Sequence, residues 1–157
     1  MIHLKEITTD EMLDECVGLK VKKEQQLYSN AYSLAEAWLQ CSIKEVDLNP
    51  FCIYKDNTMV GFVMFLYCED EKYASIYRFM IDKRYQGKGY GKEAMSVVLE
   101  YINDNPKFDD CTIGLEVHRD NDVAINLYKS FGFLPTGEVD DNGEMEMELI
   151  RPKTVRR

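Results

Sequence analysis

This sequence is organised around Gln86-Gly87-Lys88-Gly89-Tyr90-Gly91, a glycine-rich loop past the middle of the chain. An apolar run over residues 73–82 predicts a strand before the loop. A helix is predicted after it, because apolar residues recur at helical spacing: Ala94, Met95, Val98, Leu99 and Ile102. The first N–H groups of such a helix are free, and glycines let the backbone approach an anion closely. With added charge from Lys88 and Lys92, the loop predicts a pyrophosphate site.

The spacing of these glycines excludes two common nucleotide-binding motifs. A dinucleotide-binding fingerprint needs G-x-G-x-x-G beside the first strand, whereas these glycines alternate and lie midway along the chain. A P-loop needs Ser or Thr after Gly-Lys, but Gly91-Lys92 is followed by Glu93. The pattern that remains is Gln-x-x-Gly-x-Gly.

A second motif follows further along the chain. Leu115-Glu116-Val117 precedes Asn121-x-x-Ala124-x-x-Leu127-Tyr128-x-x-Phe131-Gly132-Phe133. Taken in this order, the two motifs resemble the coenzyme A segments of the GCN5-related N-acetyltransferase superfamily, with Lys83 as a departure where relatives often carry proline. The resemblance implies an acetyl-CoA-dependent N-acetyltransferase, in which the strand at residues 79–81 splays from its neighbour and binds the pantetheine arm. It assigns cofactor binding to Phe79, Met80, Ile81, Gln86, Gly87, Lys88, Gly89, Tyr90, Gly91, Lys92, Asn121 and Tyr128.

The expected reaction sets requirements for acid and base groups. A primary ammonium of pKa ~10.4 is neutral only about once in 2,500 at pH 7, so a base must remove its proton. The resemblance favours Glu116 as that base, with Tyr77, Glu69 and Asp70 as alternatives; Glu116 could instead only hydrogen-bond neighbouring groups. It also implies that Tyr128 protonates the departing thiolate, the alternative being a packing role. Direct transfer is expected, because no cysteine has a recognisable activating partner. Asn121 could also cap the following helix.

The acceptor is expected to be a small cationic amine. Residues 28–38, together with residues 78–91, resemble the bacterial spermine/spermidine acetyltransferases. Spaced carboxylates and aromatic faces bind a polyamine through ion pairs and cation–π contacts, and the candidates are Tyr28, Glu36, Trp38 and Tyr77. Each also has a structural interpretation, such as a helix cap for Glu36 and a core anchor for Trp38. Other hypotheses are an aminoglycoside-like antibiotic or a protein N-terminus as acceptor, or a module that senses acetyl-CoA or a polyamine without turnover.

Hydrophobic patterning predicts one mixed α/β domain over residues 1–150, followed by a short basic tail at 151–157. The predicted strands are 2–7, 51–54, 59–67, 73–82, 112–117, 133–139 and 144–150. The predicted helices run from Thr8 to about Glu24, from Ser33 onward, from the glycine loop to Asn105, and over 121–131. The resulting order is βααβββαβαββ, and the superfamily resemblance implies a mostly antiparallel central sheet flanked by helices.

The composition limits the classes of partner that we expect the protein to bind. The formal net charge of −9 disfavours nucleic acid, which requires a basic surface, and weakly favours a cationic partner. The five cysteines show no Cys-x-x-Cys pair or ligand-like spacing to histidine, so we expect core cysteines and no metal. Neither a leader sequence nor a membrane span is evident, which predicts a cytoplasmic protein. A homodimer formed through the edge strands of the last hairpin is a further hypothesis.

Overall fold

The computed structural model describes residues 1–25, 28–43 and 46–152. Its strands are β1 (Ile2–Lys5), β2 (Asp47–Lys55), β3 (Thr58–Cys68), β4 (Tyr73–Ile81), β5 (Thr112–His118), β6 (Phe133–Val139) and β7 (Glu144–Leu149). Its α-helices are α1 (Asp10–Gly18), α2 (Asn30–Ile43), α3 (Tyr90–Asp104) and α4 (Asp122–Ser130). Two short 3-10 helices are η1 (Lys23–Gln25) and η2 (Pro106–Phe108). The order βααβββαβαββ is confirmed.

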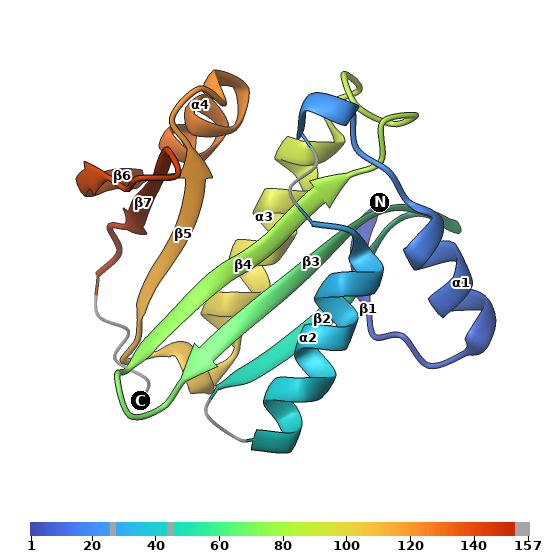
Figure 1. Cartoon of the computed structure of the whole chain (residues 1–157), viewed down its shortest axis with the longest axis horizontal. Helices are drawn as coiled ribbons and strands as arrows, with labels where there is room; N and C mark the ends of the chain where they lie inside the picture. The colour runs from blue at the N-terminus through green and yellow to red at the C-terminus, as the bar shows by residue number, and fades with distance from the viewer. Residues whose placement is uncertain (26–27, 44–45, 153–157) are drawn as a thin grey trace.

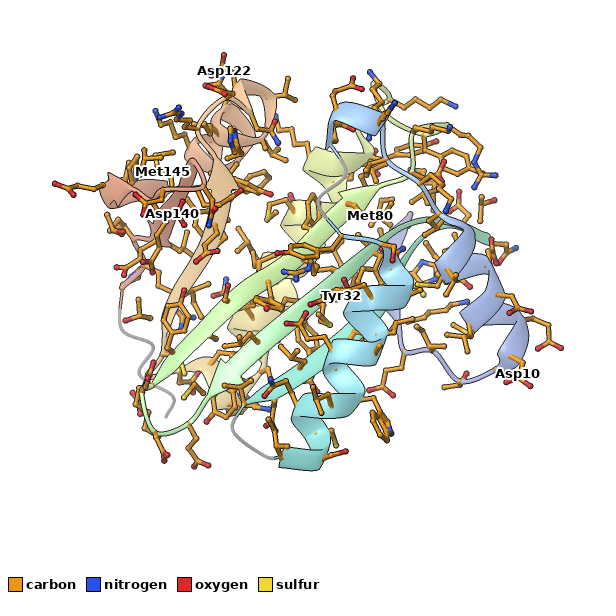
Figure 2. All side chains as sticks on the ribbon, in the orientation of Figure 1. Asp10, Tyr32, Met80, Asp122, Asp140 and Met145 are labelled. Carbon is orange, nitrogen blue, oxygen red and sulfur yellow. The ribbon has the colours of Figure 1, made fainter. Side chains whose placement is uncertain are left out.

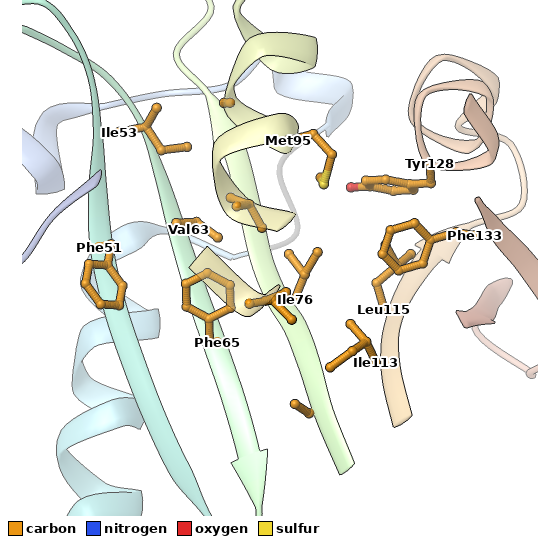
Figure 3. Close-up of a cluster of buried hydrophobic side chains, with 14 of the residues drawn as sticks. Phe51, Ile53, Val63, Phe65, Ile76, Met95, Ile113, Leu115, Tyr128 and Phe133 are labelled. Carbon is orange, nitrogen blue, oxygen red and sulfur yellow. The ribbon is translucent and has the colours of Figure 1, made fainter. Parts of the chain in front are cut away.

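In the described part of the chain, the strands form one sheet in the order β1-β2-β3-β4-β5-β7-β6. Only the β4–β5 pairing is parallel; all other neighbours are antiparallel. Helices α1 and α2 cover β2–β4 on one face, and α3 lies behind the sheet (Figure 1). The larger core lies on the α3 and α4 side, where Phe65, Ile76, Met95 and Leu115 interdigitate (Figure 3).

Strands β4 and β5 are hydrogen-bonded only at their beginnings. The paired residues are Tyr73–Ser75 and Thr112–Gly114 in order, and no pairing follows. Beyond that point the strands diverge, and β5 pairs with β7 alone (Figure 1). We call this opening, between residues 76–81 of β4 and 115–118 of β5, the β4–β5 fork. The predicted splay of the strand at residues 79–81 is therefore present.

The first helix is shorter than predicted. It ends at Gly18, not near Glu24, because the chain turns away to meet the end of β4. There the N–H of Lys20 donates to Asp82 Oδ2 at 2.8 Å, and the N–H of Lys83 donates to the carbonyl of Lys20 at 2.7 Å. The predicted cap at Thr8 is also wrong, since Thr9 accepts the hydrogen bond from the N–H of Met12.

Helix α2 begins earlier than predicted, and its outer face is apolar. Its first turn is capped by Ser29, whose hydroxyl accepts from the N–H of Tyr32, while Ser33 is buried inside the helix. Trp38 is 73% exposed, so its interpretation as a core anchor is wrong.

Two other helices begin with a carboxylate. Asp10 of α1 and Asp122 of α4 each lie at the positive end of the helix dipole (Figure 2).

The cysteines divide into two groups, and none of them forms a disulfide. Cys16, Cys52 and Cys111 are buried, as expected for core residues. Cys68 is half-buried and Cys41 is exposed, so the core expectation is wrong for Cys41.

Candidate active site

The glycine loop leaves the start of α3 open to an anion. Gly87 and Gly89 have φ values of 75° and 82°, which strain any other residue, and a Cβ at either position would meet no atom within 4 Å. Gly89 is the N-cap of α3 and offers no side chain to its first turn. The leading N–H groups of this helix are therefore available, and the exposed side chains of Lys88 and Lys92 add positive charge beside them. This arrangement fits a pyrophosphate.

Gln86 anchors the loop to the end of β4. Its side-chain Nε2 donates to the carbonyl of Ile81 at 2.9 Å and to Gln25 Oε1 at 3.0 Å. The side chain thereby ties the loop to β4 and to η1. A Cβ at Gly91 would lie 3.9 Å from the side chains of Ile81 and Leu127, so the start of α3 lies close to both β4 and α4.

Asp82 is a buried anchor that the sequence interpretation missed. It is 1% exposed, and its Oδ1 accepts from the N–H of Arg84 at 2.9 Å and from Arg84 Nε at 2.7 Å. Burial raises the pKa of this carboxyl, but the donors on Arg84 and the N–H of Lys20 outweigh it, so the pKa lies below its ordinary value. An aspartate at the end of an apolar strand with arginine two residues later was the available signal.

The three β4 residues assigned to the pantetheine arm lie along the fork. Phe79, Met80 and Ile81 pair with β3 on one side, and no strand pairs with them on the β5 side. Phe79 packs toward the α3 core and Met80 toward α1 and α2. The edge of β4 that faces the fork is thus free to hydrogen-bond an extended ligand, as edge strands do.

Tyr128 lies on α4 beside the fork. It is 8% exposed, and its ring packs edge-on against Phe133 at 6.0 Å between centroids. The hydroxyl points toward Met95 of α3 (Figure 3). Burial raises the pKa of Tyr128 to about 12, so the phenol keeps its proton at neutral pH.

Glu116 lies on β5 and faces away from the α3 core. Its neighbours Leu115 and Val117 are buried in that core, so the exposed Glu116 carboxylate lies on the opposite face of the sheet. It pairs in register with Glu146 of β7. Alternation along β7 places Glu144 and Glu148 on the same face. These four glutamates form what we call the acidic face.

Tyr73 joins the acidic face to β4. Its hydroxyl donates to Glu146 Oε1 at 3.4 Å, and burial followed by the charge of Glu146 raises the pKa of Tyr73 to about 12. Gly114 provides the room for this ring, because a Cβ at that position would collide with the Tyr73 hydroxyl. The acidic face therefore begins where the fork opens. By contrast, Glu69 and Asp70 lie in the β3–β4 turn, at the end of β4 remote from the glycine loop (Figure 1).

Three of the predicted acceptor residues are brought together. Tyr77 donates its hydroxyl to Glu36 Oε1 at 2.8 Å, and Tyr28 lies against Arg78, which also binds Glu36. Trp38 does not join them, since two residues along a helix turn the side chain by roughly 200° from that of Glu36. Asn121 is the N-cap of α4 and accepts from the N–H of Ala124 at 3.2 Å, so its alternative capping role is confirmed.

Neither a metal cluster nor a membrane-spanning helix is found in the described part of the chain. Among the described residues, no group of three or more His, Cys, Asp and Glu side chains is arranged to hold a metal ion. No helix in the described ranges has both the length and the apolar character that a bilayer crossing requires.

Comparisons with known proteins agree with this geometry. The model of the acetyltransferase (GNAT) family matches residues 13–133. The chain is 33% identical over 153 residues to the spermine/spermidine N(1)-acetyltransferase of Bacillus subtilis, covering 93% of this chain and 96% of that protein. It is structurally similar to a chimera of the spermidine N-acetyltransferase SpeG from Vibrio cholerae and hSSAT, with a TM-score of 0.69 and 18% identity over 95% of this chain and 94% of that one.

A second solved structure is the PaiA N-acetyltransferase of Thermoplasma acidophilum, in complex with coenzyme A. The TM-score is 0.63 at 23% identity, covering 95% of this chain and 98% of that one. The family model spans most of the chain, and the predicted glycine loop and fork both lie inside the matched residues. The chain therefore belongs to the acetyltransferase (GNAT) family and is an acetyl-CoA-dependent N-acetyltransferase.

Proposed function

We propose that this enzyme acetylates a primary amine of a polyamine such as spermine or spermidine. The observation that carries the proposal is the 33% identity, over 93% of the chain, to a protein named for spermine and spermidine acetylation. The similarity extends through residues before the glycine loop, the part of the chain expected to shape the acceptor site.

The acidic face supports a polycationic acceptor. Glu116, Glu144, Glu146 and Glu148 lie on two paired strands beside the fork, on the face opposite the α3 core. Directly opposed or alternate residues on paired strands lie about 5–7 Å apart, a spacing that lets one flexible polyamine contact several carboxylates. Ion pairs to ammonium groups are charge-assisted hydrogen bonds, roughly twice as strong as neutral ones. Like charges so close repel one another, and a bound polycation removes that repulsion.

Each part of the site then has a defined task. Acetyl-CoA supplies the activated acetyl group. The loop residues Gln86 to Gly91, with Lys92 and Asn121, hold the phosphate end, and the free β4 edge at residues 79–81 holds the extended arm. Glu116 removes a proton from the acceptor ammonium, and Tyr128 holds a proton for the departing sulfur. Tyr28, Glu36 and Tyr77 line the acceptor side.

Coenzyme A release from purified protein tests this proposal. The amines are spermine, spermidine, lysine, an aminoglycoside and a peptide with a free N-terminus, each added with acetyl-CoA and a thiol-reactive dye. Preferred turnover of spermine or spermidine supports the proposal. Turnover of another amine alone rejects the polyamine and leaves the enzyme class unchanged, whereas cofactor binding without turnover supports a sensor.

A substitution within the acidic face tests that surface specifically. Glu146→Gln removes one carboxylate without changing side-chain shape, and its expected effect is a higher KM for spermine with little change for a monoamine. Glu100→Gln is the matched control, because Glu100 is exposed on α3, which lies on the other side of the sheet from the acidic face. Equal effects of the two variants would contradict the acidic face as the acceptor surface.

A further inference from the structure

Arg78 is the centre of a polar cluster at the fork. Its side chain is only 19% exposed, and its guanidinium lies between the rings of Tyr77 and Tyr28, at 4.1 and 4.3 Å from their centroids. Nη2 donates to Glu36 Oε2 at 3.2 Å, while the Tyr77 hydroxyl donates to Glu36 Oε1 at 2.8 Å. The cluster thus joins β4 to α2 and to the segment just before α2.

A β-bulge explains why two adjacent residues take part. Met64 of β3 pairs with Arg78, whereas the next residue, Phe65, pairs with Ile76. Tyr77 is therefore the extra residue of the bulge, which turns two successive side chains to the same face of the sheet. Both Tyr77 and Arg78 consequently reach the same glutamate on α2. The bulge lies just beyond Ser75, the last residue of β4 that pairs with β5.

Arg78 also binds the backbone of the bulge. Its Nη1 donates at 2.9 Å to the carbonyl of Tyr77, the residue without a partner in the β3 register. One planar guanidinium therefore bridges the bulge carbonyl and Glu36 at once, which a lysine ammonium cannot do with the same fixed geometry. Its Nε is buried without a hydrogen-bond partner in the described part of the chain. Stability alone does not favour such an unpaired donor.

We propose that Arg78 is a positioning residue that fixes the course of β4 where it leaves β5. It acts through the Tyr77 carbonyl and Glu36, without touching the reacting atoms. The free edge of β4 begins at this bulge, so its direction sets where the acetyl group lies relative to Tyr128. The inference rests on acetyl transfer itself, and it holds for whichever amine is the acceptor.

The test compares three variants. Arg78→Gln removes the bridge, and Arg78→Lys keeps the charge but loses the planar fork. Lys107→Gln is the matched control, because Lys107 also lies over a tyrosine, Tyr67 at 4.2 Å, and pairs with a carboxylate, Asp47 at 3.1 Å, far from the fork. For each variant, kcat is measured with the best acceptor at a temperature where melting curves show folded protein, and coenzyme A binding is measured by calorimetry.

We expect kcat to fall by roughly 10–100-fold in both Arg78 variants, as misplacement of reacting groups by about 1 Å does. Coenzyme A affinity should change little, because Asp82 and Gln86 anchor the glycine loop separately. Lys107→Gln should retain full kcat. The loss should be the same for every amine that the wild type accepts.

Several results would overturn the proposal. One is an Arg78→Gln protein that is folded and has the kcat of the wild type. A second is full activity of Arg78→Lys, which would show that a point charge suffices; this variant also decides the matter if Arg78→Gln does not fold. A third is a loss confined to polyamines, which would make Arg78 a residue of acceptor recognition. If the enzyme does not acetylate polyamines, the same kcat measurements are made with whichever amine it accepts.

Discussion

Replacing Tyr128 by phenylalanine separates the role of its hydroxyl from the packing of its ring. The ring lies edge-on against Phe133, and this contact survives the substitution. Tyr128 is 8% exposed, and its hydroxyl has no hydrogen-bond partner among the described residues but keeps some contact with solvent, so its removal leaves no orphaned group behind. The two consequences, for rate and for stability, should therefore have opposite signs.

The magnitudes follow from the two roles. A positioned proton donor contributes about 10²–10⁴-fold to a rate, so we expect kcat to fall at least ~100-fold, or ~2.7 kcal/mol. A fully buried, unpaired hydroxyl costs about 1–3 kcal/mol, and this one is only partly buried, so the phenylalanine variant should be as stable as the wild type or more stable by up to ~1 kcal/mol. For a domain of this size, that gain raises Tm by about 2–4 °C.

The assays are coenzyme A release at saturating substrates and thermal unfolding of both proteins. Thermal unfolding at high pH gives a second test. Because the pKa of Tyr128 is raised to about 12 in the fold, against about 10 in the unfolded chain, its ionisation opposes folding: wild-type stability is unaffected below about pH 10 and falls as pH rises toward 12. The Tm advantage of the variant should therefore widen above pH 10. Wild-type kcat in Tyr128→Phe would refute the proton-donor assignment.

Four further outcomes are expected. Asp82→Asn should cost about 2 kcal/mol in denaturant unfolding and, because the lowered pKa of Asp82 means stability lost as pH falls below about 4, should flatten the acid side of the stability profile. Gly89→Ala should weaken coenzyme A binding in calorimetry by at least about tenfold, with about 1 kcal/mol of backbone strain at φ 82°. Glu116→Gln should lower kcat/KM by about 100-fold for every accepted amine; an unchanged kcat/KM would place the base elsewhere. Gly114→Ala should displace the Tyr73 ring and lower Tm, whereas Gly137→Ala, where a Cβ meets nothing, is its control.

Local patterns in the sequence were enough for the element order and the glycine loop. Alternation and helical spacing record which face of each element is buried, and φ > 0 at Gly87 and Gly89 is a property of the glycines themselves. Tyr128 and its packing partner Phe133 are also close in sequence, but the role of the Tyr128 hydroxyl is implied by the superfamily resemblance and stays a prediction. These features depend on residues within one or two turns of each other.

Contacts between distant segments explain the remaining errors. The end of α1 is set by Asp82, which binds the backbone of Lys20 from the far end of β4. The pairing of Arg78 with Glu36 depends on a bulge in β4 and on the packing of α2, and neither has a periodic signature. The exposure of Trp38 likewise follows from which side of α2 meets the sheet. Because Tyr32, Leu39 and Ile43 are also exposed, α2 carries apolar side chains on its outer side as well, and helical spacing did not indicate which side packs.

Strand β4 is fixed at two points that serve different parts of the reaction. At its end, Asp82 and Gln86 hold the glycine loop, so damage there should weaken coenzyme A binding before it slows acetyl transfer. At its bulge, Arg78 and Glu36 hold the fork, so damage there should slow transfer while binding persists. Only a few residues separate the two anchors, and a rigid strand would transmit a shift from one to the other. Combining Asp82→Asn with Arg78→Gln decides between these cases. If the anchors are independent, their losses in transition-state free energy for acetyl transfer are additive. If the strand couples them, the double variant loses less than the sum.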